Sequence, residues 1–255
     1  VVPNANCLVA LPDRDNVLVL PPQLARAQVL AVDSLAERVQ QLRLRANKSL
    51  RFEAGQHFEL SWSSNLIRMY SAASLQTDTE LTFHIQLHRY GRASRHLAEV
   101  MKTGDSVRVR GPLGTAYLRR NCSAPILCIS SNTGLGPMLA LLRTIAEARM
   151  SNPVYIYAGF AMSEDEYGRA ELERAAKDLP SLRRYQTVIG GGTLRRGDRR
   201  GLLTDALAAD RANLRNCRAY LFGSPHAVEA TSRLLRRNGI APERLHAEPF
   251  HYSGL

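Results

Sequence analysis

Arg68-Met69-Tyr70-Ser71 lies between two stretches that have the composition of β-strands. Phe58-Glu59-Leu60-Ser61-Trp62 precedes it, and Leu81-Thr82-Phe83-His84-Ile85-Gln86-Leu87 follows it. In an extended chain, its arginine and tyrosine point to one side and its serine to the other. One surface would then offer a charge to a phosphate and a flat ring to a flat ligand. Taken alone, the four residues could also form an ordinary half-buried edge strand.

Around this stretch the chain consists of short alternating runs of apolar and polar residues, separated by turn signals. These runs cover residues 28–32, 39–45, 56–62, 81–88 and 106–110. Short strands at such spacing predict a small antiparallel barrel. One helix is expected within it, at 94–101, with Ser94 as its N-cap.

The pattern changes after residue 124. Ile126-Leu127-Cys128-Ile129-Ser130 is continuously apolar up to its last residue, which is typical of a strand buried on both faces. Further strands are expected at 154–158, 184–189, 218–222 and 244–248, and helices at 138–150, 166–178, 202–208 and 225–238. Strands that alternate with helices predict βαβ units and a parallel sheet. We therefore expect a tail or linker at 1–22, a barrel at 23–120 and an α/β domain at 121–255.

Three loops of small residues follow expected strands of the α/β part, where the ligands of open parallel sheets bind. They are Thr133-Gly134-Leu135-Gly136-Pro137, Gly159-Phe160-Ala161 and Gly223-Ser224-Pro225. The glycines of the first loop permit close backbone approach, and its proline suits the first turn of a helix that could bind phosphate. A tight strand-to-helix turn without a ligand fits the first loop too. Together the three loops favour a crevice of dinucleotide size.

The barrel part offers a matching feature at Gly91-Arg92-Ala93-Ser94. As the start of a helix, this stretch presents backbone N–H groups and an arginine to a second anion. The alternative is a capped helix without a ligand.

Composition narrows the choice of partners. The 255-residue chain has a net charge of +11 and a pI near 10.0. Such a basic balance makes nucleic acid one candidate partner. However, its arginines are spread out without interleaved aromatic residues, so an acidic protein partner explains the charge at least as well. The sequence has no run of 18 apolar residues, so no membrane span is expected. The four cysteines fit neither a disulfide framework nor a metal cluster, so a cytoplasmic location is the default.

Four motifs in order carry a resemblance to a known family. Arg-x-Tyr-Ser and Gly-x-x-Ser in the barrel part, then Thr-Gly-x-Gly-Pro and Gly-Ser-Pro in the α/β part, resemble the ferredoxin–NADP reductase superfamily over about residues 25–255. Within it, the chain is most similar to the NADH-dependent flavoprotein reductases of bacterial aromatic-ring dioxygenases. The resemblance implies an enzyme that passes electrons from NADH through FAD to an acidic ferredoxin or a terminal oxygenase.

The resemblance also implies roles for single residues. Arg68 would pair with the FAD pyrophosphate, Tyr70 would stack on the isoalloxazine ring beside Met69, and the Ser71 hydroxyl would approach N5. Further FAD contacts would come from His84, Ile85, Gln86, Gly91, Arg92, Ala93 and Ser94. The nicotinamide nucleotide would be held by Thr133, Gly134, Gly136, Pro137, Gly159, Gly223, Ser224 and Pro225. Glu248 and Phe250 would lie near the flavin, and Ser71 and Glu248 are the candidates for tuning its N5.

The chain departs from the family pattern at several positions. Phe222 stands where the family usually has a cysteine that helps to place the nicotinamide, and Asn132 replaces a common glycine. Gly190-Gly191 stands where NADP users tend to have Ser-Arg for the 2′-phosphate. This favours NADH, although Arg195 and Arg196 leave NADPH open.

Many such reductases carry a plant-type [2Fe-2S] domain ahead of the barrel. The C-x₄-C-x₂-C signature is absent from this sequence. Asn6-Cys7-Leu8 and the stretch at 15–20 nevertheless resemble the end of such a domain, with Cys7 as its last ligand. We expect a cluster only in a longer protein, and the alternative is a free cysteine in an irregular tail.

Two other functions stay open on the sequence alone. One is an NAD(P)H flavin reductase or the reductase of another oxygenase. The other is a basic nucleic-acid-binding module without a redox role, whose DNA affinity would depend strongly on salt.

Overall fold

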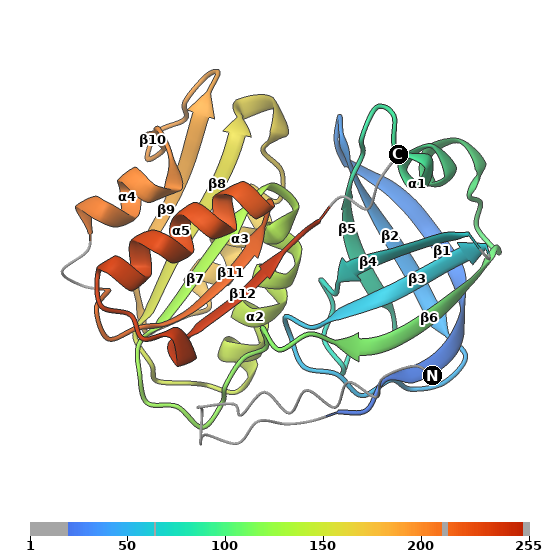
Figure 1. Cartoon of the computed structure of the whole chain (residues 1–255), viewed down its shortest axis with the longest axis horizontal. Coiled ribbons are helices and arrows are strands. Elements are labelled where there is room, and N and C mark those ends of the chain that lie inside the picture. Colours follow the sequence, from blue (N-terminus) through green and yellow to red (C-terminus); the bar gives the residue numbers. More distant parts are fainter. Residues whose placement is uncertain (1–19, 64, 211–213, 252–255) are drawn as a thin grey trace, which may run out of the picture.

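Two six-stranded sheets, one antiparallel and one parallel, form the two halves of the protein (Figure 1). The computed structural model describes residues 20–63, 65–210 and 214–251. The antiparallel sheet comes first along the chain and the parallel sheet second, as the sequence predicts. Cys7 lies outside the described residues.

The antiparallel sheet has the strand order β4-β3-β6-β1-β2-β5. Its strands are β1 (Gln23–Ala36), β2 (Val39–Ala46), β3 (His57–Ser63), β4 (Leu66–Ser71), β5 (Leu81–Gln86) and β6 (Ser106–Leu113). An isolated bridge between Ala72 and Phe83 joins the two outer strands and closes the sheet into a barrel. Alternate residues of β5 are buried, so one face of the strand fills the barrel core. The predicted barrel is confirmed.

The helix of the barrel half differs from the prediction. It begins as α1 (Arg92–Arg95), with Gly91 at the N-cap, and continues as a π-helical turn, η1 (His96–Val100). The predicted N-cap at Ser94 is therefore wrong. The Ser94 hydroxyl lies within the helix and accepts a hydrogen bond from the backbone N–H of His88 at 2.9 Å. A serine side chain can satisfy a backbone group outside the helix as readily as one at the helix end.

The parallel sheet has the strand order β10-β9-β8-β7-β11-β12. Its strands are β7 (Ile126–Ser131), β8 (Val154–Met162), β9 (Leu182–Gly191), β10 (Arg199–Arg200), β11 (Arg218–Gly223) and β12 (Leu245–Pro249). The order reverses between β7 and β11, which places a ligand crevice beyond their carboxyl ends. The two-residue β10 is too short to leave a sequence signal.

Helices cover both faces of the parallel sheet. They are α2 (Leu135–Glu147), α3 (Arg169–Lys177), α4 (Leu203–Ala209) and α5 (Pro225–Arg237), with short turns η2 (Asn132–Gly134), η3 (Ser163–Asp165) and η5 (Pro242–Arg244). Ile126 and Cys128 pack in one core with residues of α2 and α3, whereas Leu127 and Ile129 pack in another with residues of α4 and α5. Burial on both faces explains why β7 is an unbroken apolar run. None of the described helices is long and apolar enough to cross a membrane.

One of the hydrophobic clusters extends across both halves. Val39, Leu75 and Leu118 belong to the same buried cluster as the apolar face of α2. Figure 1 shows α2 on the side of the parallel sheet that faces the barrel. This packing defines the space between the halves.

Candidate functional site

A cleft of about 740 Å³ is lined by both halves of the protein, a volume within the usual range of ligand sites. The barrel half contributes His57, Arg68, Met69, Tyr70, Ser71, His84, Gln86, His88, Arg89, Tyr90, Gly91, Ala93 and Ser94. The parallel-sheet half contributes Ser131, Asn132, Thr133, Ser224, Glu248, Pro249, Phe250 and His251. The structure thus brings together residues separated by most of the chain.

Strand β4 contains the stretch Arg68-Met69-Tyr70-Ser71, and all four of its residues line the cleft. Tyr70 packs 6.0 Å, between ring centroids, from Trp62 of β3. Burial raises the pKa of the Tyr70 phenol, so the hydroxyl stays neutral. Arg68 donates a hydrogen bond to the carbonyl of Ile67 at 2.8 Å. The buried Ser71 hydroxyl has no hydrogen-bond partner among the described residues, and Ser71 lines the cleft.

The loop after β7 meets the loop after β11 on the opposite wall. Ser131 Oγ accepts the backbone N–H of Ser224 at 2.9 Å, and the Ser224 hydroxyl accepts the N–H of Ala227 and caps α5. A Cβ atom on Gly134 would lie 2.2 Å from the carbonyl oxygen of Phe222, so only glycine allows this approach. Asn132 has a φ of 47°, a left-handed conformation that asparagine tolerates better than most residues. This explains how Asn132 can replace a glycine.

The carboxyl end of β12 brings Glu248 and Phe250 to the cleft, as the sequence predicts. Strand β12 runs parallel to β11, and the N–H of Phe250 donates to the carbonyl of Gly223 at 2.8 Å. The carboxylate of Glu248 lies 3.1 Å from Nδ1 of His57, an ion pair whenever the imidazole is protonated. His57 could not be predicted as a cleft residue, because a histidine at the start of a strand carries no distinctive signal.

Several expected site residues do not line the cleft, and one of them, Arg92, is exposed to solvent instead. The Ile85 side chain is buried in the barrel core. Seven others do not line the cleft, namely Arg92, Gly134, Gly136, Pro137, Gly159, Gly223 and Pro225. Phe222 is 1% exposed and packs in the core shared by both halves, so its side chain does not line the cleft either. These glycines and prolines shape the loops rather than the surface.

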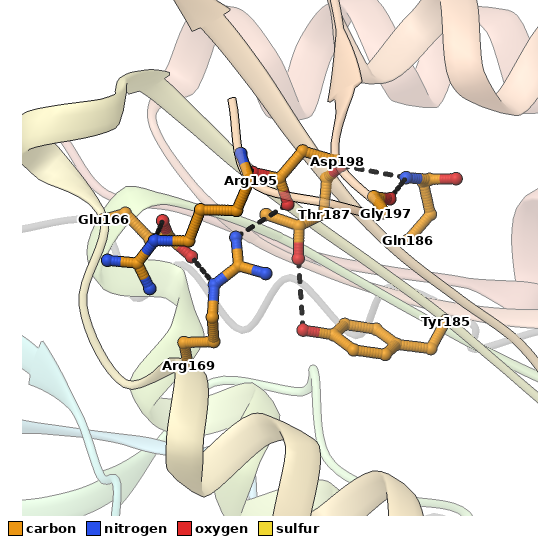
Figure 2. A network of polar contacts seen from close by, with 8 residues as sticks. All are labelled: Glu166, Arg169, Tyr185, Gln186, Thr187, Arg195, Gly197 and Asp198. Atoms are coloured by element: carbon orange, nitrogen blue, oxygen red, sulfur yellow. Dashed lines mark hydrogen bonds and ion pairs between the residues drawn. The ribbon is translucent and has the colours of Figure 1, made fainter. Parts of the chain in front are cut away.

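A network of polar contacts lies beside the middle of β9, where the 195–198 turn packs along the strand (Figure 2). The guanidinium of Arg169 pairs with Glu166 and with Asp198, the latter at 2.7 Å. Asp198 also accepts the backbone N–H of Arg195 at 2.8 Å, and Gln186 donates to the carbonyl of Gly197 at 2.8 Å. These contacts hold the 195–198 turn, and they leave Arg195 itself 66% exposed, 4.0 Å from Glu166.

The lining fits a flavin dinucleotide and a nicotinamide nucleotide. Arg68 offers a charge for phosphate and Tyr70 a ring for stacking. Ser71 Oγ and Gln86 Oε1 are buried polar atoms that lack partners within the described residues. The N-terminus of α5 adds backbone N–H groups across the cleft, where the half-charge of a helix end favours an anion.

Comparisons with known proteins agree with this fit. Residues 26–117 match the family model described as an oxidoreductase FAD-binding domain, and residues 129–233 match an oxidoreductase NAD-binding domain.

Two similar relatives are reductases of dioxygenase systems. A ferredoxin–NAD(P)⁺ reductase component of naphthalene 1,2-dioxygenase/salicylate 5-hydroxylase systems, from Ralstonia sp, is 37% identical over 98% of this chain and 76% of its own length. The toluate 1,2-dioxygenase electron transfer component of Pseudomonas putida is 30% identical over 96% of this chain and 73% of its own. Among solved structures, a cytochrome P450 reductase from Amycolatopsis superposes with a TM-score of 0.83 at 30% identity, covering 92% of this chain and 72% of that one.

Proposed function

Because the chain belongs to the ferredoxin reductase family of FAD- and NAD-binding oxidoreductases, we propose that it passes electrons from NADH through FAD to an iron–sulfur protein of an aromatic-ring dioxygenase. The observation that carries this proposal is the buried Ser71 hydroxyl, which has no partner in the described part of the chain and lies next to Tyr70 in a cleft that the nucleotide loops also line. The barrel domain would extend over 23–120 and the nucleotide domain over 121–255. We propose a [2Fe-2S] centre only for a longer protein, in which Cys7 would be one of its ligands.

Each wall of the cleft would hold one ligand. On the barrel side, Arg68 would bind the FAD pyrophosphate, and Tyr70 would pack its neutral ring against the flavin. FAD, when bound, supplies the acceptor for a hydride and can release single electrons. Ser71 Oγ would orient that acceptor by a hydrogen bond, and the packed walls would exclude water.

The opposite wall would hold the nicotinamide nucleotide. Thr133 and Ser224 line the cleft at the two strand ends that flank the reversal of strand order. The first turn of α5 would receive a phosphate. Glu248, at the end of β12, would tune the flavin N5, and its carboxylate lies 3.1 Å from Nδ1 of His57.

We propose NADH as the preferred donor. Gly190 and Gly191 offer no side chain to a 2′-phosphate, and the nearby Glu166 and Asp198 carboxylates partly neutralise the local arginine charge. Stopped-flow reduction of the FAD-loaded protein by NADH and by NADPH tests this. Faster reduction by NADPH at equal concentration would contradict the preference.

The partner in this proposal is an acidic ferredoxin or terminal oxygenase. Arg89, Arg92 and Arg95 make no ion pair with a carboxylate of the described residues, and α1 packs near β4 at the cleft. Exposed Met69 and Tyr90 add apolar surface there. An acidic protein with an apolar contact fits such a surface.

Electron transfer to a ferredoxin, measured by the difference in absorbance between its reduced and oxidised forms, tests the partner surface. Arg95→Glu should slow transfer several-fold at low salt and leave flavin reduction by NADH unchanged, because the substitution changes only the approach of the acidic partner. Arg236→Glu on α5 is the control. Equal slowing by both substitutions would argue against this surface.

The central experiment is a titration with FAD followed by anaerobic addition of NADH. The proposal predicts one tightly bound FAD per chain and rapid bleaching of the flavin by NADH. A protein that does not bind FAD, and that binds DNA with strong salt dependence, would instead be the nucleic-acid module.

A further inference from the structure

Tyr167 joins the two halves of the protein at the cleft. It lies between η3 and α3 in the parallel-sheet half and is 4% exposed. Its phenol oxygen is 3.1 Å from Nδ1 of His84, which belongs to β5 of the barrel and lines the cleft. The two rings also pack edge to face, with centroids 5.4 Å apart. A single side chain therefore contacts the barrel wall from the other half through both packing and a hydrogen bond.

The same phenol oxygen contacts the nucleotide loop. The backbone N–H of Gly136, in the first turn of α2, lies near it and acts to lower the pKa of the phenol. A Cβ atom on Gly136 would lie 3.0 Å from Nδ1 of His84, a tight contact, so the lack of a side chain at residue 136 lets the loop come this close without a shift of His84. Tyr167, His84 and Gly136 thus meet at one point, where the barrel wall touches the loop that carries Thr133.

The protonation states of the three groups agree with this arrangement. Burial lowers the pKa of His84 to about 4, so the imidazole is neutral near pH 7. Burial raises the pKa of the Tyr167 phenol, which keeps its proton. The phenol can then donate to Nδ1 of His84, while its oxygen lies near the backbone N–H of Gly136.

Ion pairs hold the two residues that precede Tyr167 in the chain. Asp165 pairs with Arg38 of the barrel half. Glu166 pairs with Arg169, which in turn pairs with Asp198 (Figure 2). Three successive residues, Asp165, Glu166 and Tyr167, therefore anchor alternately to the barrel, to the nucleotide half and to the barrel again. A side chain held in this way has little freedom to move.

We propose that Tyr167 is a positioning residue, whose hydroxyl sets the distance between the barrel wall at His84 and the nucleotide loop at Gly136. This inference rests on the proposed function, because these two surfaces would carry the flavin and the nicotinamide. Hydride transfer is sensitive to that distance, since a misplacement of about 1 Å can slow a reaction by about a hundredfold.

Tyr167→Phe tests the inference, because it keeps the ring and removes only the hydroxyl. We expect one FAD per chain, as in the wild type, but flavin reduction by NADH slower by about tenfold under single-turnover conditions. In the FAD-free protein, hydrogen exchange should become faster in a peptide that covers residues 131–142, since the loop loses the phenol hydroxyl that packs beside it. Tyr157→Phe is the matched control: its buried hydroxyl binds Asp210 within the nucleotide half, at 2.6 Å, away from the cleft. It should keep the wild-type reduction rate.

A double substitution separates positioning from general loss of structure. His84→Gln and Tyr167→Phe remove the two ends of one contact, so their effects on the reduction rate should not multiply in the double variant. Fully multiplicative effects, a wild-type reduction rate in Tyr167→Phe, loss of its FAD, or an equal loss of rate in Tyr157→Phe would each overturn the inference. Failure of NADH to reduce the wild-type flavin would overturn the proposed function itself.

Discussion

The carboxylate of Asp78 accepts two hydrogen bonds from the guanidinium of Arg143, at 2.8 and 2.9 Å. Asp78 lies between β4 and β5 of the barrel, and Arg143 lies on α2 of the other half. Asp78 also accepts the backbone N–H of Leu75 at 2.9 Å. One carboxylate therefore closes a turn in the barrel and binds α2 in a bidentate geometry, which is the stronger form of an arginine–carboxylate pair.

Removing this charge should loosen the contact between the halves. We expect Asp78→Asn to lower the free energy of unfolding by about 1 to 2 kcal/mol, since the pair is partly exposed and screened. Denaturant unfolding measures the change. Asp33→Asn, which removes an exposed partner of Arg43, should change the same quantity by less than about 0.5 kcal/mol. Similar losses in both variants would mean that the bidentate geometry adds nothing.

The same carboxylate should contribute to acid stability. Burial alone would raise the pKa of Asp78, but the hydrogen bonds from Arg143 and Leu75 outweigh it and lower the pKa. A lowered pKa stabilises the fold above the ordinary carboxylate pKa, and this stabilisation is lost as the pH falls through the lower value of the folded state. Asp78→Asn should therefore lose less stability than the wild type on acidification below about pH 4.

His84 should affect stability in a higher pH window. Burial lowers its pKa from 6.5 to about 4. Between these values the unfolded chain takes up a proton that the folded protein does not, so the free energy of unfolding should fall as the pH falls from 6.5 towards 4. The slope for one such group is at most about 1.4 kcal/mol per pH unit. His84→Gln, studied without FAD, should flatten this part of the profile; an unchanged slope would rule out His84 as its source.

Substitutions of Arg68 and Ser71 should affect two different quantities, the affinity for FAD and the rate of FAD reduction. Arg68→Ala should weaken FAD binding by about ten- to a hundredfold, because it removes a charge-assisted contact to phosphate. Ser71→Ala should keep FAD but slow its reduction by about tenfold or more, because it removes the hydrogen bond at the reacting end. Fluorescence titration and stopped-flow absorbance measure the two quantities. Arg108→Ala, outside the cleft lining, is the control, and undiminished FAD affinity in Arg68→Ala would refute its assignment.

Phe222 should matter for stability. It is 1% exposed and packs in the core that both halves share. Phe222→Ala should lower the free energy of unfolding by about 3 to 5 kcal/mol, because it removes buried surface and leaves a cavity. Leu24→Ala, at a side chain that is 69% exposed, should change it by less than about 0.5 kcal/mol. A small effect at Phe222 would mean that the surrounding core collapses into the space.

The types and order of the elements could be predicted from the sequence because they depend on local patterns. Alternation in β5 follows from one buried face, and the unbroken apolar run of β7 follows from two. The start of α1 could not be predicted in the same way. The Ser94 hydroxyl had two possible partners, and the fold gave it the N–H of His88 rather than an N–H of its own helix.

The candidate site, too, was predicted in part from local sequence and in part depends on tertiary packing. The sequence alone determined which residue types are present for phosphate, ring and hydroxyl contacts, and the motifs at Arg68–Ser71 and Thr133–Pro137 stand in an order that indicated the family. Only the tertiary structure decided that His84 and Tyr167, 83 residues apart, share a hydrogen bond at the cleft, and that Phe222 faces the core. The reason is physical: periodicity records which face of an element is buried, whereas the partner on that face depends on how separate elements pack.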